Sequence, residues 1–244
     1  MILPTIRTVT PRPGSKSERD LGVGDAATLV IDTLRRGGMA VVPLDVAYGV
    51  LAGSREALER IYLAKGRPRT KPCGLLASWS QFNALSTGRP SAKRAVGRVI
   101  QSGFPLGVIT SVDWTNPVAQ AIPRSCSDLL VRDDAIALFL RMGGMADALL
   151  DAADRERVIL YGSSANRSSA GNSFSLAEVP REILETADVI CDGGPCALSN
   201  EARLPSTMIN LRNGQMTRRG ILSPEIRDLL NAGSARDALC RPAM

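Results

Sequence analysis

A short segment with the sequence KGRPRTKP, residues 65–72, carries four cations within seven positions. Two prolines restrict its backbone, so the charges of Lys65, Arg67 and Lys71 are held at defined spacings. Cations at defined positions, and guanidinium groups in particular, suit the oxygens of a polyphosphate. The segment therefore predicts a phosphate-binding loop, in contrast to a diffuse basic surface.

A second polar segment, Ser163-Ser164-Ala165-Asn166, follows an apolar run at residues 158–161 that is typical of a buried strand. Its small hydroxyl and amide groups can approach phosphate oxygens closely. Ligands of open α/β sheets bind beyond the carboxyl ends of strands, where we expect this segment to lie. Together with the basic loop, the segment predicts a nucleotide site.

The chain of 244 residues has a net charge of +6 and contains no histidine. Ser-His-Asp and Cys-His catalytic groups are therefore excluded within it, and Cys191 and Cys196 lack partners for a zinc site. Five scattered cysteines fit a reduced protein. No apolar run approaches the length of about 18 residues that a membrane span needs, and the first residues do not form a secretory signal. We expect a cytoplasmic protein with no metal site and no membrane partner.

The hydrophobic pattern predicts strands and helices that intermix without a regular βαβ rhythm, which favours one α/β domain built on a mixed sheet. Asn213-Gly214 also predicts a type I′ hairpin near the end. We divide the chain into a polar arm at residues 1–22, a nucleotide-binding domain at 23–222 and a tail at 223–244. The predicted strands are 39–44, 48–52, 73–77, 107–112, 135–140, 158–161, 189–191, 206–211 and 215–219. The predicted helices are 25–36, 55–64, 91–101, 145–153, 182–186 and one after 223.

Five segments occur in the order in which the YrdC family carries its motifs, and each resembles one of them. They are PLDVAYG at 43–49, the K-x-R and K-P pairs at 65–72, SAN at 164–166, PSTM at 205–208 and RRG at 218–220. Each motif alone is weak, but five in register are specific. The chain resembles this family over residues 25–222.

The resemblance implies a twisted mixed sheet with flanking helices around a basic cavity. It also implies a nucleotidyltransferase activity of the kind found in the best-known members, which act in tRNA modification. Those members make threonylcarbamoyl-AMP from L-threonine, bicarbonate and ATP and release pyrophosphate, with Mg²⁺ carried in by ATP. Such a transfer needs alignment and charge neutralisation more than it needs a general base. A site of cations and hydroxyls without histidine is adequate for it.

The resemblance also assigns roles to ten residues. Lys65, Arg67 and Lys71 would hold the phosphates and act in catalysis. The nucleotide would also contact Ser164, Asn166 and Arg218. The second substrate would lie against Leu44, Val46, Arg141 and Ser206.

The first motif departs from the family pattern, because Leu44 and Val46 stand where the family has threonines. A site built to hydrogen-bond a substrate hydroxyl does not place leucine against it, since an unpaired polar group is costly. We therefore expect the phosphate-binding end to be retained and the second substrate, either the amine acceptor or the carbamoyl donor, to be altered.

Two other functions stay open from the sequence. A module that binds double-stranded RNA by its shape needs cations but no aromatic platforms, and the net charge of +6 fits RNA as well as it fits a nucleotide. Single-stranded RNA is less favoured, because no aromatic residues are interleaved with the cations. A non-catalytic YrdC paralogue is the remaining alternative.

Overall fold

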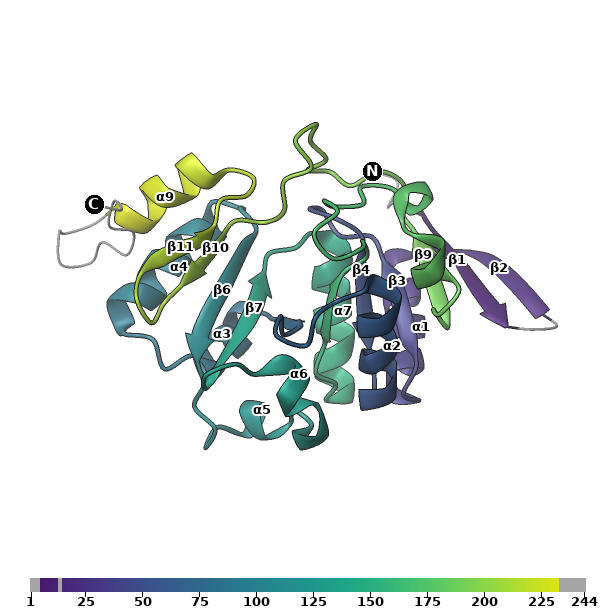
Figure 1. Ribbon diagram of the computed structural model, residues 1–244, viewed down its shortest axis with the longest axis horizontal. Helices are drawn as coiled ribbons and strands as arrows, with labels where there is room; N and C mark the ends of the chain where they lie inside the picture. The colour runs from purple at the N-terminus through teal and green to yellow at the C-terminus, as the bar shows by residue number, and fades with distance from the viewer. Residues whose placement is uncertain (1–4, 13–14, 233–244) are drawn as a thin grey trace.

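The structure, a computed structural model, describes residues 5–12 and 15–232 of the chain. Within these residues, eleven strands form one sheet in the order β11-β10-β6-β7-β5-β8-β4-β3-β9-β1-β2, which spans the molecule in Figure 1. The pairs β3/β9, β5/β7 and β6/β10 are parallel and the other pairs are antiparallel. The mixed sheet predicted from the sequence is thus confirmed. The strands are β1 (Thr5–Arg12), β2 (Ser15–Gly22), β3 (Met39–Val42), β4 (Gly49–Ala52), β5 (Gly74–Leu76), β6 (Leu106–Ser111), β7 (Ala135–Leu140), β8 (Tyr161–Ser164), β9 (Val189–Asp192), β10 (Met208–Asn210) and β11 (Gln215–Arg218).

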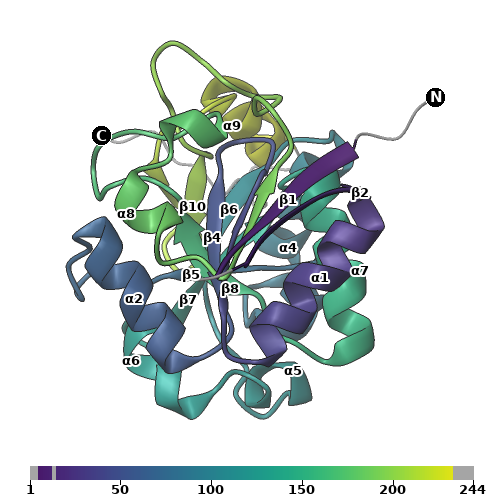
Figure 2. The same cartoon turned by 90° about the vertical axis from the view of Figure 1, so that its right-hand side faces the viewer.

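Helices cover both faces of the sheet. In Figure 2, α1 and α7 lie on one side of it, and α2 and α8 lie on the other. None of the helices in the described residues is long and apolar enough to cross a membrane. The helices are α1 (Val23–Arg35), α2 (Arg55–Lys65), α3 (Trp79–Leu85), α4 (Pro90–Gln101), α5 (Pro117–Gln120), α6 (Ser127–Leu130), α7 (Gly144–Glu156), α8 (Arg181–Leu184) and α9 (Ser223–Asn231).

The position of the basic loop is set by α2, which ends at Lys65. The helix begins after Ser54, whose Oγ accepts a hydrogen bond of 3.1 Å from the Ala57 N–H and so caps the helix. Leu58 and Ile61 bury its apolar face against the sheet. The helix stops at Gly66, whose left-handed backbone (φ +57°) suits glycine. Both ends of α2 are therefore defined, and the loop starts from a rigid support.

The first residues differ from the loosely packed lead-in expected from their polarity. β1 and β2 form an antiparallel hairpin, and β1 also pairs with β9 at the edge of the sheet. Ile6 and Thr8 are buried, so one face of β1 contributes to the core despite the polar sequence. Backbone pairing with β9, which lies far away in the sequence, stabilises β1. The local hydrophobic pattern does not indicate this pairing. The division into arm, domain and tail stays a prediction.

Two local predictions differ from the structure. The strand expected at residues 158–161 is observed as β8 at Tyr161–Ser164, so Ser164 belongs to the strand that was expected to precede it. The hairpin at Asn213-Gly214 is confirmed, but the type I′ turn is wrong. Gly214 has a φ of +72° while Asn213 is not in the left-handed region, and four residues separate the paired Asn210 and Gln215.

Candidate functional site

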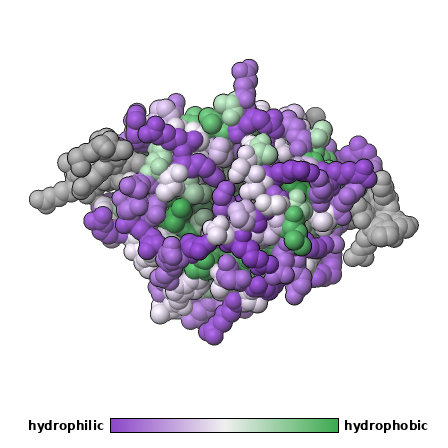
Figure 3. All heavy atoms as spheres, viewed as in Figure 1, coloured by the Kyte–Doolittle hydropathy of each residue, from purple (hydrophilic) through white to green (hydrophobic). Residues whose placement is uncertain are grey.

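A cavity of about 800 Å³ lies on the sheet face that also carries α1 and α7. Residues of β4, β5, β6, β7 and β8 form its floor, and the loops after α2 and β8 form its walls. Figure 3 shows apolar surface between hydrophilic rims over β6 and β7. Nine of the ten residues assigned from the sequence line the cavity: Leu44, Val46, Lys65, Arg67, Lys71, Ser164, Asn166, Ser206 and Arg218.

Glycines make room at the centre of the floor. Gly74 on β5 is paired with Gly162 on β8, and Gly49 on β4 is paired with Ser164. A Cβ atom at Gly74 would lie 2.5 Å from Phe139 Cε2, so no larger residue fits there. Because Gly74 has no side chain, the Phe139 ring packs directly against the strand backbone and forms part of the floor.

Lys65 is buried, with 2% of its surface exposed, and connects the two predicted segments. Its ammonium group donates hydrogen bonds to the backbone oxygens of Ser164 and Asn166. Burial lowers the pKa of Lys65 to about 7, and the charge of Arg67 adds to this effect. An ammonium group has three donors, so one N–H remains for a ligand in the cavity. A bound anion would restore the charged form.

Arg67 and Lys71 shape the loop as well as charging it. Arg67 donates to the backbone oxygens of Lys71 (2.9 Å) and Pro72 (2.7 Å) and to Ser163 Oγ (3.3 Å). Lys71 is exposed at the rim and donates to Ser169 Oγ at 3.3 Å. Arg69, the fourth cation of the segment, instead forms an ion pair with Glu59 at 3.5 Å. Three of the four cations of the loop thus line the cavity.

The Ser-x-Asn segment is held by its own hydrogen bonds. Ser164 Oγ donates to Asn166 Oδ1, and Asn166 Nδ2 donates to the backbone oxygen of Arg167 at 2.6 Å. The Ala165 N–H donates to the backbone oxygen of Tyr48 at 2.6 Å, which ties this segment to the first motif. The two segments converge on one wall through Lys65, and their side chains are pre-positioned.

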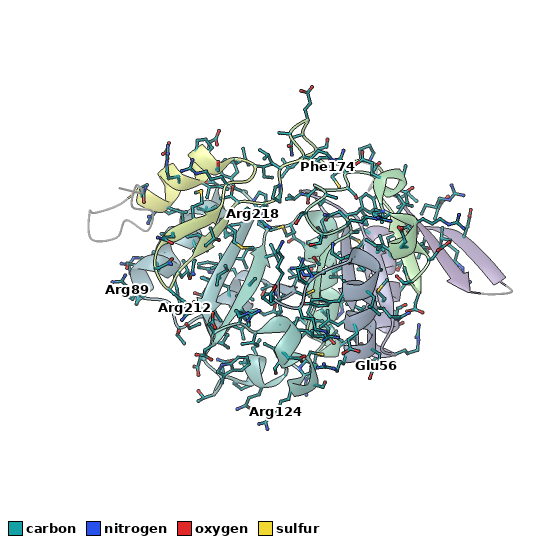
Figure 4. All side chains as sticks on the ribbon, viewed as in Figure 1. Glu56, Arg89, Arg124, Phe174, Arg212 and Arg218 are labelled. Carbon is teal, nitrogen blue, oxygen red and sulfur yellow. The ribbon has the colours of Figure 1, made fainter. Side chains whose placement is uncertain are left out.

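Arg218 faces the basic loop from β11, on the other side of the cavity. Its Nε donates to the backbone oxygen of Ser206 and its Nη2 donates to Ser206 Oγ, both at 2.9 Å. Burial lowers the pKa of Arg218, with a further contribution from the charge of Arg67. Figure 4 shows Arg218 at the end of β11 and Phe174 on the loop after β8.

The structure does not bring Arg141 to the cavity. This residue follows β7 with a φ of +60°, and its side chain pairs with Asp147 at 3.5 Å. The next residue, Met142, lines the cavity together with Leu44 and Val46. One end of the cavity is therefore apolar and continuous with the core beneath α1 and α7.

Asn172 and Arg203 are among the cavity residues that the sequence analysis missed. Asn172 follows the Ser-x-Asn segment, and its Nδ2 donates to the backbone oxygens of Val46 and Leu204, both at 3.4 Å. Arg203 pairs with Glu178 at 2.6 Å, and its guanidinium lies 5.5 Å from the centre of the Phe174 ring. Both lie in segments without a periodic pattern, so only the tertiary contacts identify them.

The charges around the cavity have one sign. Five cations line it, and no aspartate or glutamate is among the described residues that do so; the cations are Lys65, Arg67, Lys71, Arg203 and Arg218. Nowhere in residues 5–12 and 15–232 do histidine, cysteine and carboxylate side chains cluster as a metal site would require. The cavity is suited to a ligand with several negative charges, and any divalent cation would have to arrive with that ligand.

Comparison with known proteins agrees with the fold. Residues 32–220 match the family model of the Sua5, YciO and YrdC proteins, which is described as telomere recombination. The threonylcarbamoyl-AMP synthase of Bos taurus is 28% identical over 227 residues, covering 84% of this chain and 75% of that protein. E. coli YciO has a TM-score of 0.64 at 20% identity, covering 82% of this chain and 92% of the other.

The structure of P. abyssi Sua5 complexed with L-threonine has a TM-score of 0.59 at 23% identity and covers 80% of this chain. This chain spans only about half of that protein, 53% of its length. At these identities the solved structures establish a shared fold. The family match extends over most of the chain and includes every loop that lines the cavity. The chain therefore belongs to the Sua5/YciO/YrdC family.

Proposed function

We propose that this protein uses ATP, bicarbonate and a small amine to make a carbamoyl-adenylate, as a nucleotidyltransferase of the threonylcarbamoyl-AMP synthase type. The observation that carries the proposal is the enclosed cavity lined by five cations and no carboxylate. Threonylcarbamoyl-AMP synthase is the name of its curated relative, and L-threonine is bound in the Sua5 structure. A carbamoyl donor other than bicarbonate would use the same cavity.

The chemistry has two steps. The amine nitrogen attacks the carbon of bicarbonate, an N–C bond forms, and the departing hydroxide takes a proton from nitrogen to leave as water. A carbamate oxygen then attacks the α-phosphorus of ATP, and the bond to the leaving pyrophosphate breaks. Charge spreads over the phosphate oxygens as this bond breaks, so positioned cations stabilise the transition state.

The residues of the cavity suit these steps. Lys65, Arg67 and Lys71 would hold the phosphates on one wall, and Arg218 would hold them from the other. Ser164 and Asn166 would contact the nucleotide between the two. Mg²⁺ would enter bound to the phosphates, because the protein side chains that line the cavity offer it hydroxyl groups but no carboxylate. Ser206, which accepts a hydrogen bond from Arg218, would lie near the second substrate.

A small ligand is favoured over double-stranded RNA by the pairing of the outer arginines. Arg55, Arg69 and Arg167 are each paired with a carboxylate on the surface, so part of the basic charge is already neutralised there. Lys65, Arg67 and Arg218 line the cavity, and no carboxylate of the described residues forms an ion pair with them. A duplex contacts cations that lie on an open face, whereas Lys65, Arg67 and Arg218 converge on one cavity.

The test is pyrophosphate release with ATP, Mg²⁺ and bicarbonate across a panel of amino acids, with carbamoyl phosphate as an alternative donor. We expect release that depends on one class of amine and is lost in Lys71→Ala. ATP binding without release for any amine or donor would favour the non-catalytic paralogue.

The variant Arg67→Lys distinguishes an ATP site from an RNA-binding surface, because lysine does not replace the two parallel hydrogen bonds of a guanidinium group. ATP binding should fall strongly and RNA binding only modestly; the reverse would favour the RNA module.

A further inference from the structure

A buried amide presents an unused acceptor to the cavity. Asn172 has 6% of its surface exposed and lines the cavity. Its Nδ2 faces the backbone oxygens of Val46 and Leu204, and because only nitrogen donates, these two carbonyls decide the orientation of the amide. Oδ1 consequently points away from them. Among the described residues, no donor reaches this oxygen, and no deeply buried polar side-chain atom lacks a partner. The oxygen is therefore accessible from the cavity.

This acceptor is a neutral amide oxygen. The neighbouring charged groups are all donors, and the lining includes no carboxylate among the described residues. Phosphate oxygens cannot use an amide oxygen, because both groups only accept hydrogen bonds. Asn172 Oδ1 must therefore pair with an N–H or O–H group of a ligand, or stay hydrated.

The position of Asn172 favours the second substrate. Its hydrogen bond to Val46 places it beside the apolar end of the cavity that is formed with Leu44 and Met142. These side chains belong to, or pack against, the core beneath α1 and α7 and offer no hydrogen-bonding group. A molecule that fits there has an apolar substituent next to an N–H donor.

A neutral acceptor also suits the chemistry. An amine must lose its extra proton before its lone pair can attack bicarbonate. A carboxylate beside it would favour the ammonium form, whereas an amide oxygen can accept one N–H without adding charge. The cations of the cavity further disfavour a second positive charge. An asparagine at this place orients the amine and leaves its lone pair available.

We infer that Asn172 binds the nitrogen of the second substrate and that this substrate is a primary amine with an apolar substituent, such as a branched aliphatic amino acid. The inference rests on the proposed function and adds the class of acceptor to it. L-Valine is the sharpest probe, because it has nearly the shape of threonine and lacks the hydroxyl group. Leu44, Val46 and Met142 would accept its methyl groups, and Asn172 would accept its N–H.

The experiment measures pyrophosphate release with saturating ATP, Mg²⁺ and bicarbonate while L-valine or L-threonine is varied. The wild type should prefer valine over threonine in kcat/KM by at least about tenfold. Asn172→Ala should raise the KM for valine by about tenfold or more and leave the KM for ATP within about twofold. Asn172→Asp should move the rise of the pH–rate profile to higher pH, because its carboxylate favours the ammonium form.

Asn200→Ala is the matched control. Asn200 Nδ2 donates to the same Leu204 oxygen at 3.3 Å, but the residue lines a separate, open pocket outside the cavity. Its loss should leave the KM for valine unchanged. An equal effect of the two alanine variants would show that Asn172 acts only by supporting the loop. A loss of ATP-over-GTP preference in Asn172→Ala would show that the amide contacts adenine. Either result overturns the inference.

Binding measurements separate this inference from the proposed function. ATP with Mg²⁺ should raise the unfolding temperature of the wild type, and valine should raise it further in the presence of ATP. If only the shift by ATP is seen, with no added shift for any apolar amine, the inference fails and nucleotide binding stands. If ATP gives no shift, the proposed function itself fails. Unfolding curves without ligand show whether each variant is folded.

Discussion

ATP binding should consume a proton at Lys65. Burial lowers the pKa of this ammonium group to about 7, so the free protein loses the Lys65 proton as the pH rises above that value. A polyphosphate in the cavity favours the charged form and raises the pKa again. The complex therefore holds a proton that the free protein does not hold at pH 8.5, and ATP affinity should decrease as the pH rises.

The size of the effect follows from the pKa. If Lys65 stays charged in the complex, the apparent Kd is proportional to one plus the ratio of neutral to charged lysine in the free protein. Between pH 7.5 and 8.5 this gives a weakening of about eightfold, or about 1.2 kcal/mol. Proton uptake should approach about one per ATP at pH 8.5. The phosphates of ATP are already almost fully ionised in this range and add little to the slope.

Isothermal titration calorimetry in buffers with different ionisation enthalpies measures both quantities. Lys65→Met should bind ATP more weakly, and with little dependence on pH, because the titrating group is gone. Lys71→Ala should also bind more weakly but keep the dependence, because Lys71 is exposed at the rim. A wild type whose ATP affinity is constant from pH 7.5 to 8.5, with no proton uptake, would refute the reasoning on Lys65.

Three further outcomes are expected. ATP with Mg²⁺ should raise the unfolding temperature, and Lys71→Ala and Ser164→Ala should each remove most of that shift; an unchanged wild-type melting curve at millimolar ATP contradicts a nucleotide site. Leu44→Thr with Val46→Thr should increase threonine-dependent pyrophosphate release by about ten- to a hundredfold, while ATP affinity holds; efficient threonine turnover by the wild type, with no gain in the variant, would show that these positions do not select the substrate. Gly74→Ala should lower the free energy of unfolding by about 1–3 kcal/mol, because its Cβ would lie 2.5 Å from Phe139 Cε2; chemical denaturation measures this, and an unchanged midpoint would show that Phe139 can move aside.

Much of the fold could be predicted because its signals are local. The apolar runs that became β3 and β7 are short; β3 lies between Gly38 and Pro43, and β7 lies between Asp134 and Arg141. Ser54 and Gly66 mark the ends of α2. The N-terminal strands could not be predicted in this way. Their side chains are mostly polar, and the residues of β9 that pair with β1 lie more than 180 positions away in the sequence. Local pattern carries no information about such a pairing.

Part of the candidate site could likewise be predicted from the sequence, and part could not. Residue types and spacing alone indicated a polyphosphate site, because four cations and two prolines in one loop have a chemical meaning wherever the loop lies. Only the tertiary structure decided which cations face the cavity: Arg69 pairs with Glu59 and Arg141 with Asp147, both away from it, while Arg203 joins from another segment.

The site of the second substrate was the part that was hardest to predict from the sequence. The sequence by itself showed that Leu44 and Val46 stand where the family pattern has threonines, which predicts an acceptor end with fewer hydrogen-bonding groups. It gave no sign of Asn172, whose sequence neighbours are ordinary loop residues. The role of that amide depends on two carbonyls, those of Val46 and Leu204, which fix its nitrogen and turn its oxygen to the cavity. A side chain's orientation is set by contacts between distant segments, and these exist only in the folded chain.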